Sequence, residues 1–367
     1  MLKVAERYVY PVGHGGFHGE KIGNDFYFIF DCGSKKKETI EKAIDKYYQG
    51  INNIDLLVIS HFHDDHYKGL KKLIREKKVK KIMIPFLAEE QKVNAILGSV
   101  LRFGENDDNL DAFKENIKMI YDTKEYLDEL RYEGQILIVG NFKEKIEEAV
   151  FGLEDLSKDI DIIRIQNGEK LKIIRDSIEW IYMPFNLSIE ASKNVLLYNE
   201  LSNLLGVQSN VDDLLTALKN KIVALEKKDL SKFYKKIREI YEENSGEINE
   251  YSLCIYSGPY LKNQKVGCLY TGDYVAIGKN LEELKKEYRT VLKTISWVQI
   301  PHHGSKDNFS RGLIFESVEN CFINIPIKSK HHPDISVVSD IKNAGCQVYK
   351  VNQLSEPICL VIFKMWK

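Results

Sequence analysis

The sequence predicts a layered α/β protein, because strands and helices alternate along most of its 367 residues. Two observations lead to this prediction. Short apolar runs of strand length recur between segments with helical spacing, and polar residues follow several of these runs directly. The composition, 44% hydrophobic and 29% charged, is that of a globular chain able to bury such a sheet. We therefore expect ligands to gather where the strands end.

The first third of the chain shows this alternation most clearly. The expected elements, in order, are a strand at 26–31, a helix at 36–48, a strand at 56–59, a helix at 68–77 and a strand at 81–85. The strand at 56–59 leads directly into the segment HFHDDH, which runs from His61 to His66. The first strand ends at Asp31, in a turn.

Two helical and charged stretches interrupt the alternation, at about 87–134 and 187–247. Neither is bounded by a linker rich in Pro, Gly or Ser, so we interpret both as insertions into a single domain that spans residues 1–367. Between them we expect strands at 136–140, 160–165, 171–175 and 178–183, and the alternation resumes at 251. The insertions could cap the active site or form the interface of a homo-oligomer.

Composition narrows the classes of function. The formal net charge of -1 provides no overall positive field for nucleic acid, although local basic patches could still bind it. The sequence has no run of about 18 apolar residues, so it predicts no membrane span. The first residues also lack the apolar core of a signal peptide. The six cysteines are scattered and lie mostly in apolar runs, which predicts buried free thiols rather than disulfides. Free thiols are typical of a reducing compartment. We expect a cytoplasmic protein that does not enter the membrane.

The segment from His61 to His66 crowds three histidines and two aspartates behind a buried strand. Imidazole nitrogens and carboxylate oxygens are ligands that zinc prefers. In an extended turn, His61 and His63 point the same way and can bind one ion, whereas Asp65 and His66 can reach a second. A solvated polar loop is the alternative, but solubility gives no reason to place three histidines here.

Other polar residues follow apolar runs in the same way. They are Asp31, Asp273, His302, His303 and His332. Each one alone is a weak signal, and Asp31 could simply favour a turn. Together they predict that several strands deliver metal ligands to one rim of the sheet.

These motifs resemble those of the metallo-β-lactamase superfamily. HFHDDH matches its HxHxDH signature, and IFDCG and LYTGD resemble its neighbouring motifs. IPHHGS, the late HHPD and the early VGHGG resemble, within that superfamily, the soluble domain of competence-type (ComEC-like) DNA-uptake proteins. The resemblance covers roughly 1–86, 160–186 and 248–367. It implies an αββα sandwich, here with two helical insertions.

The resemblance also implies a role for each motif residue. His61 and His63 would bind a metal ion at a first position, and Asp65 and His66 would bind one at a second. Asp273 would bridge the two positions. Either His302 or His303 would complete the second position, and His303 is preferred. Asp31 would orient a ligand histidine from behind. Asp65 also counts as catalytic, and His332 would bind or protonate the substrate.

One departure from the family bears on how many ions are bound. The family takes a third histidine for the first metal from the middle of the chain, and this sequence has none between His66 and His302. The matching place is Met183, whose thioether is a poor ligand for zinc. The first position could therefore be weakened, vacant, completed by water, or completed by a residue of an insertion. We expect one or two zinc ions, with manganese as an alternative.

The function implied is that of a metal-dependent hydrolase that acts through metal-activated water. The resemblance favours a phosphodiesterase or nuclease, with a nucleic acid or a nucleotide phosphodiester as substrate. Basic runs at 35–37 and 71–81 could track a phosphate backbone, or could be solvated helix faces. The alternatives are hydrolysis of carbonyl esters such as lactones or thioesters, and a non-catalytic interaction protein with a degenerate metal site.

Overall fold

The computed structural model describes residues 3–106, 110–142, 150–157, 159–187, 195–208, 210–244, 252–260, 264–329 and 331–365. The chain divides into two compact units, which are described separately. The first unit contains all the strands of the described residues, and the second contains helices α4 to α9. No helix in the described part of the chain combines the length and the apolar character needed to cross a membrane.

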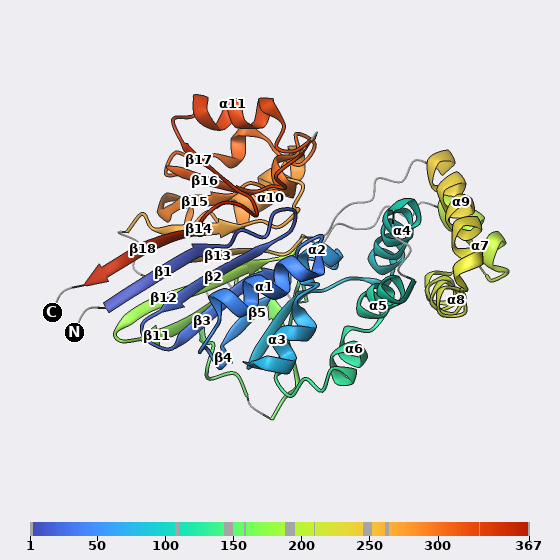
Figure 1. Ribbon diagram of the computed structural model, residues 1–367, viewed down its shortest axis with the longest axis horizontal. Helices are drawn as coiled ribbons and strands as arrows, with labels where there is room; N and C mark the ends of the chain where they lie inside the picture. The colour runs from blue at the N-terminus through green and yellow to red at the C-terminus, as the bar shows by residue number, and fades with distance from the viewer. Residues whose placement is uncertain are drawn as a thin grey trace. The chain divides into compact units, whose positions relative to one another are not determined.

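The first sheet of the first unit has the strand order β10-β8-β7-β5-β3-β2-β1-β18. Its strands are β1 (Lys3–Val9), β2 (Phe17–Ile22), β3 (Phe26–Cys32), β5 (Leu56–Val58), β7 (Lys81–Pro85), β8 (Gln135–Gly140), β10 (Ile162–Gln166) and β18 (Ile358–Met365). Neighbours from β3 to β10 pair in parallel. β1 pairs antiparallel with both β2 and β18, which brings the first and last strands side by side (Figure 1).

The second sheet has the strand order β17-β16-β15-β14-β13-β12-β11-β9. Its strands are β9 (Val150–Gly152), β11 (Lys170–Arg175), β12 (Ile178–Phe185), β13 (Cys254–Pro259), β14 (Gly267–Tyr270), β15 (Ile295–Gln299), β16 (Asn320–Asn324) and β17 (Gln347–Val351). β11 to β14 form an antiparallel set, and β14 to β17 pair in parallel. A separate pair joins β4 (Asn53–Ile54) to β6 (Lys78–Val79).

The two large sheets enclose one apolar layer. Phe28 and Phe30 of the first sheet belong to the same buried cluster as Trp180, Tyr182 and Tyr270 of the second. Rings of Phe28 and Tyr182 stack with centroids 4.7 Å apart, and those of Phe30 and Tyr270 lie 5.0 Å apart. Burial of aromatic surface between the sheets is the main force that holds them together.

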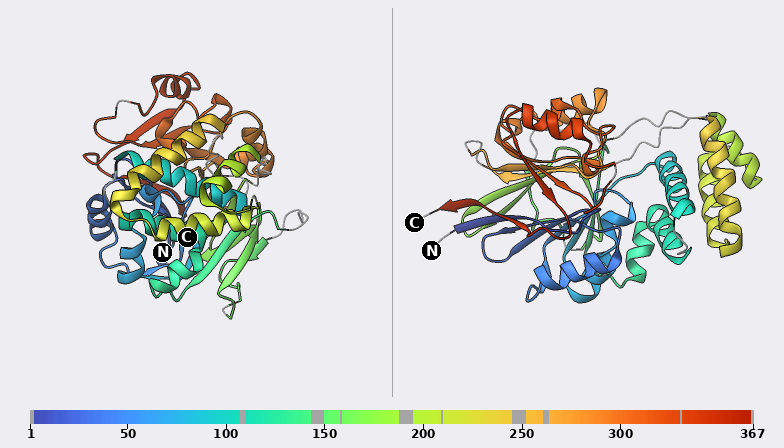
Figure 2. Two further views of the ribbon diagram at one scale, coloured as in Figure 1. Left: turned by 90° about the vertical axis from the view of Figure 1, so that its right-hand side faces the viewer. Right: turned by 45° about the horizontal axis from the view of Figure 1, so that its top comes forward.

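Helices cover both outer faces of this sandwich (Figure 2). On one side lie α1 (Lys37–Tyr47), α2 (Asp64–Tyr67) and α3 (Leu70–Glu76), and on the other α10 (Gly278–Glu287) and α11 (Ile335–Asn343). Short 3₁₀ turns occur at Leu292–Thr294, His302–Gly304 and Arg311–Leu313. Because β12 alternates, its residues 181, 183 and 185 join the apolar cluster that includes α10 and α11. The order helix, sheet, sheet, helix confirms the predicted fold class.

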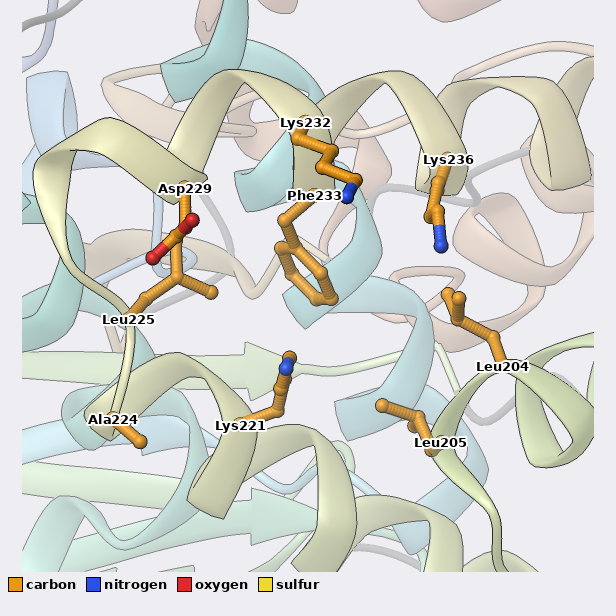
Figure 3. A pocket seen from close by; sticks show the side chains of 9 residues that line it. All are labelled: Leu204, Leu205, Lys221, Ala224, Leu225, Asp229, Lys232, Phe233 and Lys236. Carbon is orange, nitrogen blue, oxygen red and sulfur yellow. The ribbon is translucent and has the colours of Figure 1, made fainter.

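The second unit consists of two helical segments that pack together. Its helices are α4 (Glu89–Asn106), α5 (Leu110–Tyr121), α6 (Thr123–Glu129), α7 (Val195–Leu205), α8 (Val211–Val223) and α9 (Lys227–Asn244). α4 contacts α5, α8 and α9, so residues from both predicted insertions form one unit. A pocket of about 260 Å³ lies within it, with Leu205 and Phe233 among its apolar residues and Lys221, Lys232 and Lys236 around them (Figure 3).

Candidate metal centre

The predicted site residues follow the carboxyl ends of strands in both sheets. Asp31 lies near the end of β3, and the segment from His61 to His66 begins shortly after β5. In the second sheet, Asp273 comes after β14, the pair His302 and His303 after β15, and His332 after β16. These strands run in parallel within their sheets, so their ends lie along a common edge.

Three imidazole nitrogens surround one carboxylate oxygen of Asp273, at what we call the first position. The Oδ2 atom of Asp273 lies 3.5 Å from His61 Nε2, 3.9 Å from His63 Nδ1 and 3.8 Å from His302 Nε2. His61 and Asp273 are both buried. His61 and His63 therefore face the same carboxylate, and His302 joins them from the second sheet.

A second group of three nitrogens surrounds Asp65, at what we call the second position. Its Oδ2 atom lies 3.5 Å from His14 Nε2, 3.6 Å from His303 Nε2 and 4.0 Å from His66 Nε2. The other carboxylate oxygen of Asp273, Oδ1, lies 3.3 Å from His66 Nε2. Asp273 thus faces both positions, one with each oxygen.

The residues present fit a divalent metal ion. The Nε2 atoms of His61, His66 and His303 are buried and have no hydrogen-bond partner among the described residues. Such atoms cost about 1–3 kcal/mol each when nothing satisfies them. Ligand atoms of His61, His66 and Asp273 all lie within 4.8 Å of one another, as do those of His14, Asp65 and His303. Imidazole with carboxylate is the donor set that binds zinc.

Asp31 orients His66 from behind. Its Oδ2 atom accepts a hydrogen bond from His66 Nδ1 at 2.7 Å and another from Ser60 Oγ at 2.9 Å, and its Oδ1 atom accepts from Ser60 N at 2.7 Å. The side chain is wholly buried. A proton held on Nδ1 leaves Nε2 free to face the cluster, which is how metal-ligating histidines are usually fixed.

Two further residues hold histidines that face the first position. Ser252 Oγ lies 3.1 Å from His61 Nδ1 and accepts a hydrogen bond from Asp273 N at 3.0 Å. Asn308 Oδ1 lies 2.8 Å from His302 Nδ1, and its Nδ2 donates to Asp273 O at 2.9 Å. Sequence reasoning missed both roles. Ser252 belongs to the sequence NEYSL at 249–253, which also resembles ComEC-like proteins, whereas Asn308 gave no signal.

At the second position, the His303 ring is fixed by the backbone. Its Nδ1 atom donates to Asn324 O at 2.9 Å, which again leaves Nε2 toward the cluster. His14 comes from the loop between β1 and β2, and its ring centroid lies 4.2 Å from that of His303. His14 was noted in the sequence only as a residue of VGHGG, without a metal role.

The electrostatics keep both carboxylates ionised. Burial alone would raise the pKa of Asp65 and of Asp273, but the neighbouring imidazoles, His66 foremost, hold the pKa of each well below its usual range. Burial also opposes a charge on His66, yet the carboxylates of Asp273, Asp31 and Asp65 outweigh it and hold the pKa of His66 well above its usual value. Burial lowers the pKa of His14 to about 4, so its imidazole is neutral near pH 7.

His332 lies beside His302 of the histidine–aspartate cluster, whereas the preceding residue, His331, is exposed. The ring centroids of His332 and His302 are 5.6 Å apart, and His332 Nδ1 is buried without a hydrogen-bond partner among the described residues. The role of His332 toward a substrate stays a prediction.

Met183 is not placed to replace a histidine ligand. Its side chain is 3% exposed and packs with Ile181 and Phe185 in the apolar cluster on the helix side of β12. The imidazole of His302 stands near Asp273 instead. The expectation that Met183 marks the missing ligand position is therefore corrected by the alternation of β12, which turns this side chain toward the helices.

The basic run at 71–81 is partly neutralised. Lys72 Nζ lies 2.8 Å from Asp45 Oδ1 and 2.8 Å from Glu76 Oε1, and Lys80 Nζ lies 2.7 Å from Asp55 Oδ1. Of the two interpretations of this run, these ion pairs favour a solvated helix face.

The two-sheet fold and the histidine–aspartate cluster define a metal-binding α/β protein. Residues 21–155, which are 135 of the 367 residues, match the family model of the metallo-beta-lactamase superfamily. This match identifies a metallo-β-lactamase superfamily domain and confirms that part of the predicted resemblance. It includes Asp31 and the HFHDDH segment. The finer resemblance to ComEC-like proteins stays a prediction.

Several solved structures are similar to the chain. A diphosphatase from the PhnP family shows 10% identity and a TM-score of 0.35, with 95% of this chain and 86% of that chain covered. Unliganded yeast PDE1 shows 9% identity and a TM-score of 0.40, with 98% and 99% covered. ST1585, an archaeal metallo-beta-lactamase superfamily protein from Sulfolobus tokodaii, shows 12% identity and a TM-score of 0.28, with 80% of this chain and 77% of that chain covered. No curated protein matches the chain. Likenesses at this level carry no argument about function.

Proposed function

We propose that the protein is a metal-dependent hydrolase that acts on phosphodiesters. The observation that carries the proposal is the pair of carboxylate oxygens, one on Asp65 and one on Asp273, each facing three imidazole nitrogens. Divalent metal ions bound at two such adjacent positions lower the pKa of water and stabilise the attacking and leaving oxygens of an in-line displacement.

The residues around these positions supply orientation and charge. Asp31 holds His66, Ser252 holds His61, and Asp273 faces both positions, so the donor atoms are arranged before any ligand arrives. His332 Nδ1, buried beside His302, is placed to hold a phosphate oxygen or to protonate the leaving oxygen.

Two adjacent positions favour phosphorus over a carbonyl carbon as the reacting centre. Displacement at phosphorus develops charge on both the attacking and the leaving oxygen, which a pair of cations stabilises together. A single zinc ion is enough for hydrolysis of many carbonyl substrates. Because Lys72 and Lys80 are paired with acids, the basic run gives little support to a long nucleic acid, and we propose a nucleotide-sized phosphodiester as the substrate.

The test compares substrate classes on one preparation. The protein, loaded with Zn²⁺ or with Mn²⁺, is assayed with bis(p-nitrophenyl) phosphate, a lactone and a thioester. We expect hydrolysis of the phosphodiester above all. Hydrolysis of the carbonyl esters alone would overturn the proposal, and so would the absence of any turnover by the metal-loaded protein.

A pair of variants then ties the activity to the site. Asp273→Ala removes the carboxylate that faces both positions, and we expect it to lower turnover by roughly a hundredfold or more while the protein stays folded. Asp64→Ala is the matched control, because Asp64 belongs to the same motif but pairs with Lys68 at 2.5 Å. Turnover retained in Asp273→Ala, with Asp64→Ala equally active, would show that the site is wrongly assigned.

A further inference from the structure

His302 faces the first position, although the family resemblance assigns His302 or His303 to the second. Between His66 and His302 the sequence has no histidine, and Met183, at the expected place, packs in an apolar cluster. We infer that two histidines outside the HFHDDH motif complete the centre: His302 completes the first position and His14 completes the second. Each position then has three imidazoles and one carboxylate oxygen. The inference rests on the metal binding that the proposed function requires, but not on any turnover.

The backbone around His302 explains how two neighbouring residues serve different positions. His302 has a φ of 47° and His303 a φ of 56°, so both lie in the left-handed region. A residue other than glycine pays roughly 1–2 kcal/mol for this conformation, and such strain is usually retained where a site needs it. Here the His302 Nε2 atom lies 3.8 Å from Asp273, and His303 Nε2 lies 3.6 Å from Asp65.

A single side chain connects His302 to the backbone of Asp273. Asn308 contacts His302 Nδ1 through its Oδ1 atom and donates to Asp273 O through its Nδ2 atom. The ring of His302 is therefore fixed relative to Asp273 by the same kind of outer contact that Asp31 provides for His66.

The loop that carries His14 lies directly against Asp65. Gly16 N donates to Asp65 O at 3.2 Å. Gly15 has a φ of 139°, and a Cβ atom there would lie 2.5 Å from Asp65 O, so a side chain would push the loop away. This close approach brings His14 Nε2 to 3.5 Å from Asp65 Oδ2.

The spacings suit shared coordination. Ligand atoms arranged tetrahedrally around zinc at roughly 2.0–2.1 Å lie about 3.4 Å from one another. The three nitrogens at the first position lie 3.5, 3.8 and 3.9 Å from Asp273 Oδ2, and those at the second lie 3.5, 3.6 and 4.0 Å from Asp65 Oδ2. Within the second set, the ligand atoms of His14, Asp65 and His303 all lie within 4.8 Å of one another.

The experiment measures metal binding without any substrate. Metal content after dialysis against Zn²⁺, calorimetric titration, and the visible spectrum of the Co²⁺-loaded protein report the number of ions and their coordination. We expect two ions per chain for the unmodified protein and one for His302→Asn and for His14→Asn, with a loss of at least tenfold in affinity at the affected position. Asparagine is chosen because it tolerates the left-handed conformation at 302. His331→Asn, which changes an exposed histidine, is the matched control and should keep two ions.

Further variants keep the inference open to refutation. If His302→Asn folds poorly, as judged by circular dichroism, His302→Gly with added free imidazole replaces it, and imidazole should restore the second ion. Two ions bound by His302→Asn with unchanged affinity would overturn the inference for the first position, and the same result in His14→Asn would overturn it for the second. A protein that binds two ions through these histidines but hydrolyses no phosphodiester would refute only the proposed function.

Discussion

Replacing Asp31 by asparagine tests whether the residue behind His66 sets metal affinity. The Asp31 carboxylate accepts three hydrogen bonds, one from His66 Nδ1 and two from Ser60. Asparagine has the same shape and tolerates the φ of 56° at this position, so the backbone can stay in place. Its amide group, however, has only one acceptor atom and no charge. Either His66 or Ser60 then faces a donor.

The expected loss follows from this geometry. Changes to residues that orient metal ligands lower metal affinity by about 10–100-fold, or roughly 1.4–2.8 kcal/mol. Because His66 loses its charged acceptor whichever way the amide is turned, the second position should weaken most. The dissociation constant is measured by competition with a chelator of known affinity, at fixed pH.

A control separates this effect from general loss of stability. Asp55 is also a buried carboxylate, which accepts from Tyr27 N at 2.8 Å and pairs with Lys80 at 2.7 Å. Asp55→Asn should lower the free energy of unfolding without changing metal affinity. A dissociation constant for Asp31→Asn within twofold of the unmodified value would refute the reasoning. An equal loss of affinity in Asp55→Asn would do so as well.

Two predictions concern buried groups that are not themselves proposed ligands. Burial lowers the pKa of His18 to about 4, so this imidazole stays neutral in the folded chain at pH 5. In the unfolded chain the same imidazole takes up a proton below about pH 6.5. The free energy of unfolding should therefore fall by about 2 kcal/mol from pH 7 to pH 5. Denaturant titration of His18→Gln should show a weaker pH dependence, and equal dependence in both proteins would contradict this. Arg7 is wholly buried and donates to Glu20 Oε1 at 2.8 Å, so Arg7→Met should destabilise the fold by about 3–5 kcal/mol, because it leaves a buried charge alone. Adding Glu20→Gln should recover much of this loss in urea unfolding, and no recovery would show that the pair does not act together.

The parts of the fold that could be predicted are those with a local signature. The strand at Leu56–Val58 is a continuous apolar run, and the sheet that it helps form is buried on both faces. β1 was not predicted, because KVAERYV carries charges that suggest a surface segment. Arg7 is nevertheless buried, since Glu20 on β2 and Tyr270 on β14 supply its partners. Those partners are distant in the sequence and cannot be recognised without the fold.

The candidate site divides in the same way. The residues of HFHDDH and the polar residues after strands could be named from the sequence, because parallel strands bring their ends to one edge. The sequence could not show which of His302 and His303 faces which carboxylate, because this depends on two successive residues in the left-handed conformation. The place of His14 depends on how closely a glycine loop approaches Asp65.

The origin of the ligands in both sheets has a consequence for the lifetime of the protein. His61 and His66 follow a strand of the first sheet, while Asp273 and His303 follow strands of the second. An ion bound by both groups would cross-link the two sheets. At a free concentration of 100 times its dissociation constant, it would add about 2.7 kcal/mol to the free energy of unfolding. A chain deprived of metal opens more readily at this edge and becomes a better target for proteolysis, so its abundance would follow the metal supply.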